Sequence, residues 1–365
     1  MNKKYFLVSI AALIILSSCT DDFEYVPAVS NKIAIGKLIF FDKNLSNPIG
    51  QACASCHAPE TGFSDPLHRA ISEGAVTGTF ANINSPNLAY NVFSPERTYN
   101  STDETFIGGL FLNGRSSNLK DQLIHPFIDA VEMNNGSIAN VVSKIKNASY
   151  FSEIEQEYGQ AKTDEELMSF IADAIAAFET SIEVNSFTSK FDYFNKQLIK
   201  FSDYEKKGLA VFQGKGKCAQ CHVLDPDERT GKILFTDFSY DNIGVPRNEN
   251  NPFYNQSATV NPAGANFIDL GIGAVVSQPQ HNGKFRVPTL RNIAISAPYF
   301  HNGSFKTLKE VIHFYNVRDV NPSEFAAPEV LENINKDELG NLKMTAEEER
   351  QLEAFLETLT DHYRK

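Results

Sequence analysis

The stretches CASCH (residues 53–57) and CAQCH (residues 218–222) decide how this 365-residue chain is interpreted. Each contains two cysteines three positions apart and a histidine directly after the second. Residues three apart on a helical turn lie on the same side, so the thiols can bond the two vinyl groups on one edge of a porphyrin. The histidine then falls beneath the iron. Cys-x-x-Cys-His is the attachment signal for c-type haem, and two copies predict two covalently bound haems.

The cysteine count supports this interpretation. The chain has five cysteines, and four of them belong to the two motifs. We predict that Cys53 and Cys56 hold one haem and that Cys218 and Cys221 hold the other. His57 and His222 are the predicted iron ligands. Two disulfides are the alternative in an exported chain. Zinc sites are a further alternative, but they would need additional Cys or His at regular spacing, which the sequence lacks.

The fifth cysteine, Cys19, follows a segment that is typical of an export signal. Two lysines precede an apolar run at residues 5–16, which is too short for a bilayer-spanning helix with two flanks. Residues 1–18 therefore predict a lipoprotein signal peptide, with a lipid on Cys19 and a tether at 19–30. This places the protein on the periplasmic side of the envelope, anchored to a membrane. An ordinary cleaved signal with an incidental cysteine is the alternative.

Charge and composition exclude one class of partner. The chain has 33 basic and 45 acidic residues, a net charge of −12. Nucleic acid is therefore not expected as a partner, because phosphate binding requires a basic surface. The negative charge permits steering of a basic redox protein. With 42% apolar residues, the chain can form a folded core.

A weak internal repeat indicates two units. An apolar stretch that starts with Gly36 precedes the first haem motif, and a similar stretch from Gly208 precedes the second. We expect a mainly α fold with two cytochrome c-like haem domains, an N-terminal peroxidatic domain at 31–190 and a C-terminal electron-transfer domain at 191–365.

Four helix starts are readable from capping residues, and little strand is expected. The predicted caps are Thr163, Ser202, Thr307 and Thr345, each followed three positions later by glutamate. Long irregular stretches at 58–104 and 223–285 are rich in Gly, Asn and Pro. Loops of that length are usually functional, and here they could wrap haem.

From about residue 35 to 359 the chain resembles the bacterial di-haem cytochrome c peroxidase family. The motifs that carry the resemblance are LIFFD (38–42), NGR (113–115), Gln122, EM (132–133), VPTLRN (287–292) and PYFHNG (298–303). The resemblance implies that hydrogen peroxide is reduced at the N-terminal haem. Electrons would come through the C-terminal haem from a small cytochrome c or a cupredoxin. It also implies a calcium ion between the domains, and members are often dimers, so a homodimer is open.

Gln122 and Glu132 match the family's distal pair above the peroxide-binding haem. A carboxyl group there can take a proton from the near oxygen of peroxide and deliver it to the far one, which makes water the leaving group. A glutamine amide can hold peroxide by hydrogen bonds. The alternative is a surface glutamate and an ordinary helix glutamine.

The distal ligands of both irons are expected to differ from the better-known branch. Tyr315 aligns where that branch has methionine, as in the enzyme that matures tryptophan tryptophylquinone, and a phenolate lowers the iron potential. His313 is a rival ligand, and a packed aromatic role for Tyr315 is also open. At the first haem the family histidine is replaced by Ala75. His68 could substitute, although a solvent-exposed loop histidine is the preferred interpretation.

The family's calcium ligands map to Asn84, Ser296 and Pro298, whose neutral oxygens suit a hard cation. His301 lies nearby in sequence and is assigned to the surroundings of the second haem.

The chain contains no tryptophan. Leu112 stands where the family has one between the haems, and Gly216 stands where the quinone-maturing enzyme has its surface tryptophan. Direct tunnelling or another residue such as a tyrosine must then serve inter-haem transfer. Peroxidase activity is the main expectation. The alternatives are a peroxide-dependent oxidase of a protein or small molecule and a non-enzymatic electron carrier.

Overall fold

A computed structural model describes residues 31–364, and these residues form a mainly helical protein with little sheet, as the sequence predicted. The predictions on the signal peptide and on Cys19 concern residues outside the described range. The α-helices are α1 (Asn31–Phe41), α2 (Leu119–Ile128), α3 (Ile138–Lys146), α4 (Phe151–Tyr158), α5 (Asp164–Glu179), α6 (Lys190–Asn195), α7 (Asp203–Gln213), α8 (Ile272–Val276), α9 (Leu308–Val317) and α10 (Ala346–Glu357).

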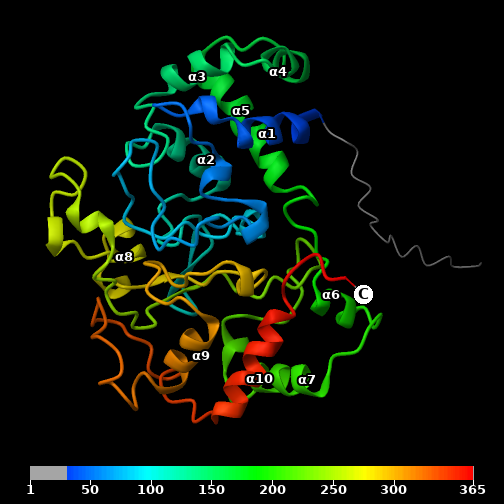
Figure 1. The fold of residues 1–365 in the computed structure, drawn as a ribbon, viewed down its shortest axis with the longest axis vertical. Helices are drawn as coiled ribbons and strands as arrows, with labels where there is room; N and C mark the ends of the chain where they lie inside the picture. Colours follow the sequence, from blue (N-terminus) through cyan, green and yellow to red (C-terminus); the bar gives the residue numbers. More distant parts are fainter. Residues whose placement is uncertain (1–30, 365) are drawn as a thin grey trace, which may run out of the picture.

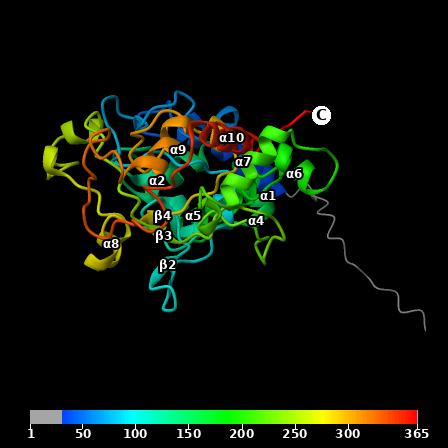
Figure 2. The same ribbon diagram turned by 90° about the horizontal axis from the view of Figure 1, so that it is seen from below.

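The strands are short and form two antiparallel pairs in the described part of the chain. β1 (Thr98–Asn100) pairs with β2 (Thr105–Ile107), and β3 (Tyr240–Asp241) pairs with β4 (Phe285–Arg286). The first pair is a hairpin that projects from the body of the molecule in Figure 2. Strands this short are not stable alone, so the helices and loops around them hold the fold.

Helices α1 to α5 pack together at one end of the molecule (Figure 1). Helix α5 contacts α1, α2 and α3, and its fully buried residues include Ile171, Ala174 and Ile175. The helix begins as the sequence predicted, because the Thr163 hydroxyl accepts a hydrogen bond from the Glu166 amide. The resulting core lies on one side of the first haem motif.

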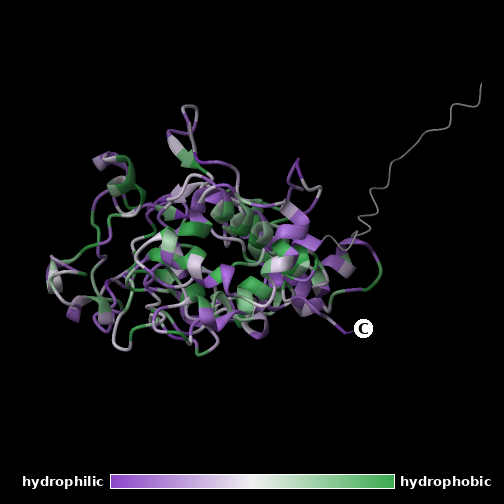
Figure 3. Cartoon of the chain, turned by 90° about the horizontal axis from the view of Figure 1, so that it is seen from above, coloured by the Kyte–Doolittle hydropathy of each residue, from purple (hydrophilic) through white to green (hydrophobic). Residues whose placement is uncertain are grey.

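Helices α7, α9 and α10 form a second cluster at the other end (Figure 1). All three begin with the predicted capping boxes, at Ser202, Thr307 and Thr345. Phe212 and Phe355 are completely buried where α7 crosses α10, with ring centroids 5.1 Å apart. Figure 3 shows the green, hydrophobic residues of the helices gathered in the interior.

The repeat around Gly36 and Gly208 has a structural cause. A Cβ at Gly36 would lie 1.9 Å from the Ala174 carbonyl oxygen of α5. A Cβ at Gly208 would lie 1.9 Å from the Gln351 carbonyl oxygen of α10. In both places a glycine lets the helix before a haem motif touch the backbone of its partner helix.

Long loops with short 3₁₀ turns lie between the two helix clusters, and they carry both haem motifs. No helix among residues 31–364 is both long and apolar enough to cross a membrane.

Candidate functional site

Both motifs fold as a single tight turn that brings the cysteines and the histidine together. Residues 53–55 and 218–220 are 3₁₀ turns. The His57 amide donates to the Cys53 carbonyl oxygen at 3.0 Å, and the His222 amide donates to the Cys218 carbonyl oxygen at 2.9 Å. All four motif cysteines are free thiols, so the disulfide alternative finds no support.

Each motif lines its own cavity, and the two cavities adjoin. The N-terminal cavity is lined by the motif residues together with the predicted distal pair; its lining includes Cys53, Cys56, His57, Gln122, Phe127, Glu132, Glu179 and Arg286. The C-terminal cavity is largely apolar; its lining includes Cys218, Cys221, His222, Leu290, His301, Tyr315, Glu329 and Met344. Asn84, Pro86, Asn91 and Arg286 line both.

The two histidines are oriented alike. Nδ1 of His57 lies 3.2 Å from the Phe63 carbonyl oxygen, and Nδ1 of His222 lies 2.9 Å from the Phe235 carbonyl oxygen. A carbonyl acceptor fixes Nδ1 as the protonated nitrogen and leaves Nε2 as the free donor to a metal. Burial lowers the pKa of His57 to about 4 and also lowers that of His222, so both rings are neutral at pH 7.

The residues present fit two haems. The four thiols and two neutral imidazoles are the required donors, and apolar side chains supply the walls. The Arg286 side chain gives independent support, because it is 2% exposed and its Nε and Nη1 atoms have no hydrogen-bond partner. Its Nη2 donates to the Asn91 side-chain oxygen at 2.7 Å, but a buried guanidinium with its other two nitrogens unsatisfied is costly. A group with two carboxylates, as haem has, would satisfy it from either cavity.

Gln122 and Glu132 both line the N-terminal cavity, and their role as a distal pair stays a prediction. Gln122 lies on α2, whose first turn is capped by Asn118. Glu132 follows in the turn after α2, where its amide donates to the Asp129 carbonyl oxygen at 3.2 Å. The helix and the turn after it therefore present an amide and a carboxyl group to the cavity that His57 lines.

Glu132 is a cavity-lining carboxyl group with a cation nearby. Burial and, to a smaller extent, the Asp129 charge raise its pKa to about 7, against the opposing effect of Arg115. Arg115 Nη2 lies 3.9 Å from a Glu132 carboxylate oxygen. The Glu132 side chain is 27% exposed, which reflects its position on the cavity wall. A carboxyl group with a pKa near the working pH serves well as a general acid or base.

Tyr315 lines the C-terminal cavity, whereas its rival His313 does not. The His313 ring nitrogens lie 3.0 Å from carboxylate oxygens of Glu349 and Glu324, on the outer side of α9. Burial raises the pKa of Tyr315. Met344 also lines this cavity, although sequence alignment did not indicate it. Both Tyr315 and Met344 are thus within the second candidate site.

His68 is exposed, and its Nδ1 lies 2.9 Å from the Ala297 carbonyl oxygen. It is not among the residues that line the N-terminal cavity. The structure thus places His68 in an exposed loop, and its part at the first iron stays a prediction.

The predicted calcium residues share one wall. Asn84, Ser296 and Pro298 all line the C-terminal cavity, and Asn84 lines the N-terminal one too. The Asn84 amide nitrogen donates to the His301 carbonyl oxygen at 2.7 Å, which ties the loop after the first motif to the segment near the second. No set of three or more His, Cys, Asp or Glu side chains within residues 31–364 is arranged for a metal. The calcium site stays a prediction.

Sequence reasoning missed three ionisable residues at the site. Arg286 lines both cavities, Arg115 faces Glu132, and Glu179 lines the N-terminal cavity with its pKa raised to about 8 by burial. Arg115 belongs to the NGR motif, which was a usable signal. The other two lie far from the haem motifs in sequence, and nothing in the local pattern marks them.

Comparisons with known proteins show which proteins this chain is similar to. The model of the family "Di-haem cytochrome c peroxidase" matches residues 30–198. The chain is 32% identical to the methylamine utilization protein MauG of Paracoccus denitrificans over 97% of this chain and 95% of that protein. It is 29% identical to the cytochrome-c peroxidase IdrP1 of Pseudomonas sp. over 92% of this chain and 82% of that protein. The crystal structure of the diheme peroxidase BthA from Burkholderia thailandensis has a TM-score of 0.78 and 32% identity, covering 91% of this chain and 86% of that one.

Proposed function

The chain belongs to the di-haem cytochrome c peroxidase family, and we propose that it reduces hydrogen peroxide to water at the N-terminal site with electrons that arrive through the C-terminal site. The observation that supports this best is the convergence of Gln122, Glu132 and the His57 motif on one cavity. A carrier of electrons alone would not need a carboxyl group with a pKa of about 7 in that place.

Cys53 and Cys56 would hold a haem and His57 would be its iron ligand, and the bound haem would supply the iron and the electrons that reduce peroxide. The Glu132 carboxylate accepts a proton from the near oxygen of peroxide and delivers it to the far oxygen, so that water leaves. Proton transfer of this kind accounts for about 10²–10⁴ in rate. The Gln122 amide orients the peroxide by donating or accepting a hydrogen bond.

The proposal is tested with protein that carries both haems. Peroxide consumption is measured with a reduced small cytochrome c and with a reduced cupredoxin as donors. We expect turnover by the untreated, oxidised protein. Ala75 replaces the family histidine that would occupy the first iron, so no ligand has to leave before peroxide binds. An absence of turnover with any donor, in protein of full haem content, would overturn the proposal.

A peroxide-dependent oxidase is the second candidate. It is favoured by Tyr315 on the wall of the C-terminal cavity and by the 32% identity to MauG, a methylamine utilization protein. The two candidates differ in the fate of the reducing agent. An oxidase would oxidise a protein or small molecule with peroxide even when no cytochrome or cupredoxin is present, whereas a peroxidase would stall after consuming one or two equivalents.

Three further features belong to the proposal. Asn84, Ser296 and Pro298 hold a calcium ion, supported by their shared wall between the two sites. Cys19 carries a lipid that anchors the protein on the periplasmic side of a membrane. The protein works as a homodimer. Chelation followed by calcium titration, mass spectrometry of the mature N-terminus and light scattering test these in turn.

A further inference from the structure

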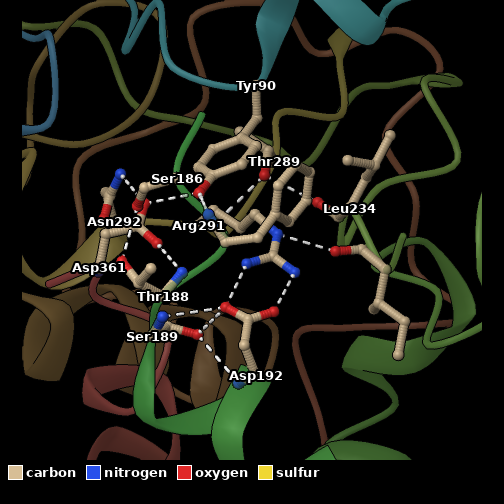
Figure 4. Close-up of polar contacts among 12 residues, drawn as sticks. Tyr90, Ser186, Thr188, Ser189, Asp192, Leu234, Thr289, Arg291, Asn292 and Asp361 are labelled. Atoms are coloured by element: carbon tan, nitrogen blue, oxygen red, sulfur yellow. Dashed lines mark hydrogen bonds and ion pairs between the residues drawn. The ribbon is translucent and has the colours of Figure 1, made fainter. Parts of the chain in front are cut away.

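A buried tyrosine next to a residue that lines both candidate haem sites is not used by the chemistry above. Tyr90 is 0% exposed. Its hydroxyl donates to a carboxylate oxygen of Asp361 at 2.6 Å and accepts from the Phe187 amide at 3.0 Å. Figure 4 shows the Tyr90 hydroxyl directed toward Asp361, with Arg291 beside the ring. The segment that carries Tyr90 borders both cavities, because Asn91 lines each of them.

A short path leads from Tyr90 to the N-terminal site. The Leu88 amide donates to the Phe63 carbonyl oxygen at 3.0 Å. The same carbonyl oxygen is 3.2 Å from Nδ1 of His57. Leu88 lines the N-terminal cavity and is two residues from Tyr90 along the chain. The path from His57 to the phenol therefore runs through the Phe63 carbonyl oxygen, which contacts both the His57 ring and the Leu88 amide, and then along the chain from Leu88 to Tyr90.

A matching path leads to the C-terminal site. The Arg291 guanidinium carbon lies 4.9 Å from the centre of the Tyr90 ring and 5.7 Å from that of Phe235. The Phe235 carbonyl oxygen is 2.9 Å from Nδ1 of His222. Leu290, directly before Arg291, lines the C-terminal cavity. Tyr90 is therefore connected with both predicted iron ligands through packed groups and hydrogen bonds.

The surroundings of the ring allow it to lose an electron. Oxidation of a phenol releases its proton, so an acceptor must lie within hydrogen-bond reach. Asp361 is such an acceptor, and a short O–H···O⁻ bond of this kind is a strong one. The Asp361 carboxylate also accepts hydrogen bonds from the Thr188 amide and the Asn292 side-chain amide, both at 3.0 Å. The Arg291 charge is offset by Asp192, which accepts two hydrogen bonds from it at 3.0 Å.

We propose that Tyr90 is a redox relay between the two haem sites, with Asp361 as its proton acceptor; this rests on the proposed peroxidase function. After hydrogen peroxide has oxidised the N-terminal site, Tyr90 gives that site one electron and passes its phenolic proton to the Asp361 carboxylate. One electron from the C-terminal site and the proton from Asp361 then restore the phenol. Each cycle moves one electron between the sites, and two cycles match one peroxide.

The test compares Tyr90→Phe with a matched control. Tyr150 also donates its hydroxyl to a carboxylate, that of Asp42 at 2.7 Å, but it packs within the N-terminal helix core. Fully haem-loaded protein is mixed with peroxide and no donor, frozen within milliseconds and examined by electron paramagnetic resonance. We expect a tyrosyl radical in the wild type and in Tyr150→Phe, and its loss in Tyr90→Phe. Stopped-flow spectra should show inter-haem transfer at least tenfold slower in Tyr90→Phe but unchanged in Tyr150→Phe.

Asp361→Asn separates the redox role from a structural one. An amide oxygen still accepts the tyrosine hydrogen bond, but it cannot take up the proton. We expect Asp361→Asn to fold with full haem content and to lose the radical and the fast transfer. Unchanged transfer in both Tyr90→Phe and Asp361→Asn would overturn the relay while peroxide turnover by the wild type stands. If Tyr90→Phe fails to fold, Asp361→Asn decides. Failure of wild-type turnover would instead overturn the proposed function.

Discussion

The guanidinium of Arg115 lies 3.9 Å from the Glu132 carboxylate, and its other face covers the Phe111 ring at 3.3 Å. The ring holds the cation in place, and the cation faces the carboxyl group proposed to move the peroxide protons. Burial raises the pKa of Glu132 to about 7, and Arg115 keeps it from rising further. The pair therefore sets the pH at which the proposed base is ionised.

Replacing Arg115 should move the pH profile of peroxide reduction. In the proposed mechanism Glu132 acts first as a base, so kcat/KM should rise with pH through its pKa. Arg115→Met removes the positive charge, which raises that pKa and shifts the acidic limb to higher pH. Arg115→Lys keeps the charge and should shift the limb less. Steady-state assays across pH 5–9 measure this, and a limb that stays in place in Arg115→Met would contradict it.

Glu132→Gln should remove the proton acceptor while preserving the shape of the side chain. We expect peroxide turnover to fall by about 10²–10⁴, with both haems still attached. Glu73→Gln is the control, because Glu73 lines the same cavity but accepts a hydrogen bond from the Gly78 amide. Equal turnover in Glu132→Gln and the wild type would mean that another group carries the proton.

Local chemistry made much of this molecule predictable. A haem motif occupies five consecutive residues, so its turn and its ligand histidine follow from sequence alone. The capping threonines work in the same way, as Thr307 and the Glu310 amide show. His313 and Tyr315 illustrate the limit. Two residues apart on a helix differ by about 200°, so only one can face a cavity, but which one depends on how α9 packs.

Long-range placement could not be read from the sequence. Arg286 meets both cavities because β4 pairs with β3 and the loop at 84–92 folds beside it. Glu179 ends a helix whose apolar pattern gives no sign of a cavity at that end. Met344 reaches the second site from the loop before α10, outside any aligned motif. Each of these depends on contacts between segments that are distant in the chain.

The ligand of the second iron can be identified by paired substitutions. Tyr315→Phe removes the phenol oxygen, and Met344→Leu removes the thioether sulfur at similar volume. We expect only Tyr315→Phe to change the optical and paramagnetic resonance spectra of the C-terminal haem. Tyr299→Phe is the control, because Tyr299 lines the same cavity but donates to the Ile293 carbonyl oxygen. A spectrum altered by Met344→Leu alone would make methionine the ligand.

The two helix crossings at glycine predict a stability cost. Gly208→Ala would place a methyl group 1.9 Å from the Gln351 carbonyl oxygen. The backbones must separate, and overpacking typically costs about 1–3 kcal/mol. Gly36→Ala should lower the free energy of unfolding by a similar amount at the α1–α5 crossing. Lys207→Ala, on the exposed face of α7, should change stability by less than about 0.5 kcal/mol. Urea unfolding measures all three, and an unchanged Gly208→Ala would show that the crossing has room.

The buried ion pair of Arg291 and Asp192 should be a major source of stability for the join between α6 and the C-terminal loops (Figure 4). The Arg291 side chain is 1% exposed, and both of its terminal nitrogens donate to the carboxylate at 3.0 Å. Asp192→Ala leaves a buried charge unpaired, which costs about 3–5 kcal/mol. The double variant Asp192→Ala with Arg291→Met should recover much of this loss. A double variant no more stable than Asp192→Ala would instead assign the loss to the Ser189 cap of α6.

The same pair predicts how that loss depends on pH. Burial alone would raise the pKa of Asp192, but the hydrogen bonds and charge of Arg291 outweigh burial and hold the pKa below its usual range. Because the folded-state pKa is lower than the unfolded one, the contribution is complete at neutral pH and is lost as pH falls through the folded-state value. The stability difference between wild type and Asp192→Ala, measured by urea unfolding, should therefore shrink below about pH 4. A difference that stays constant on acidification would mean that the carboxylate charge does not stabilise this join.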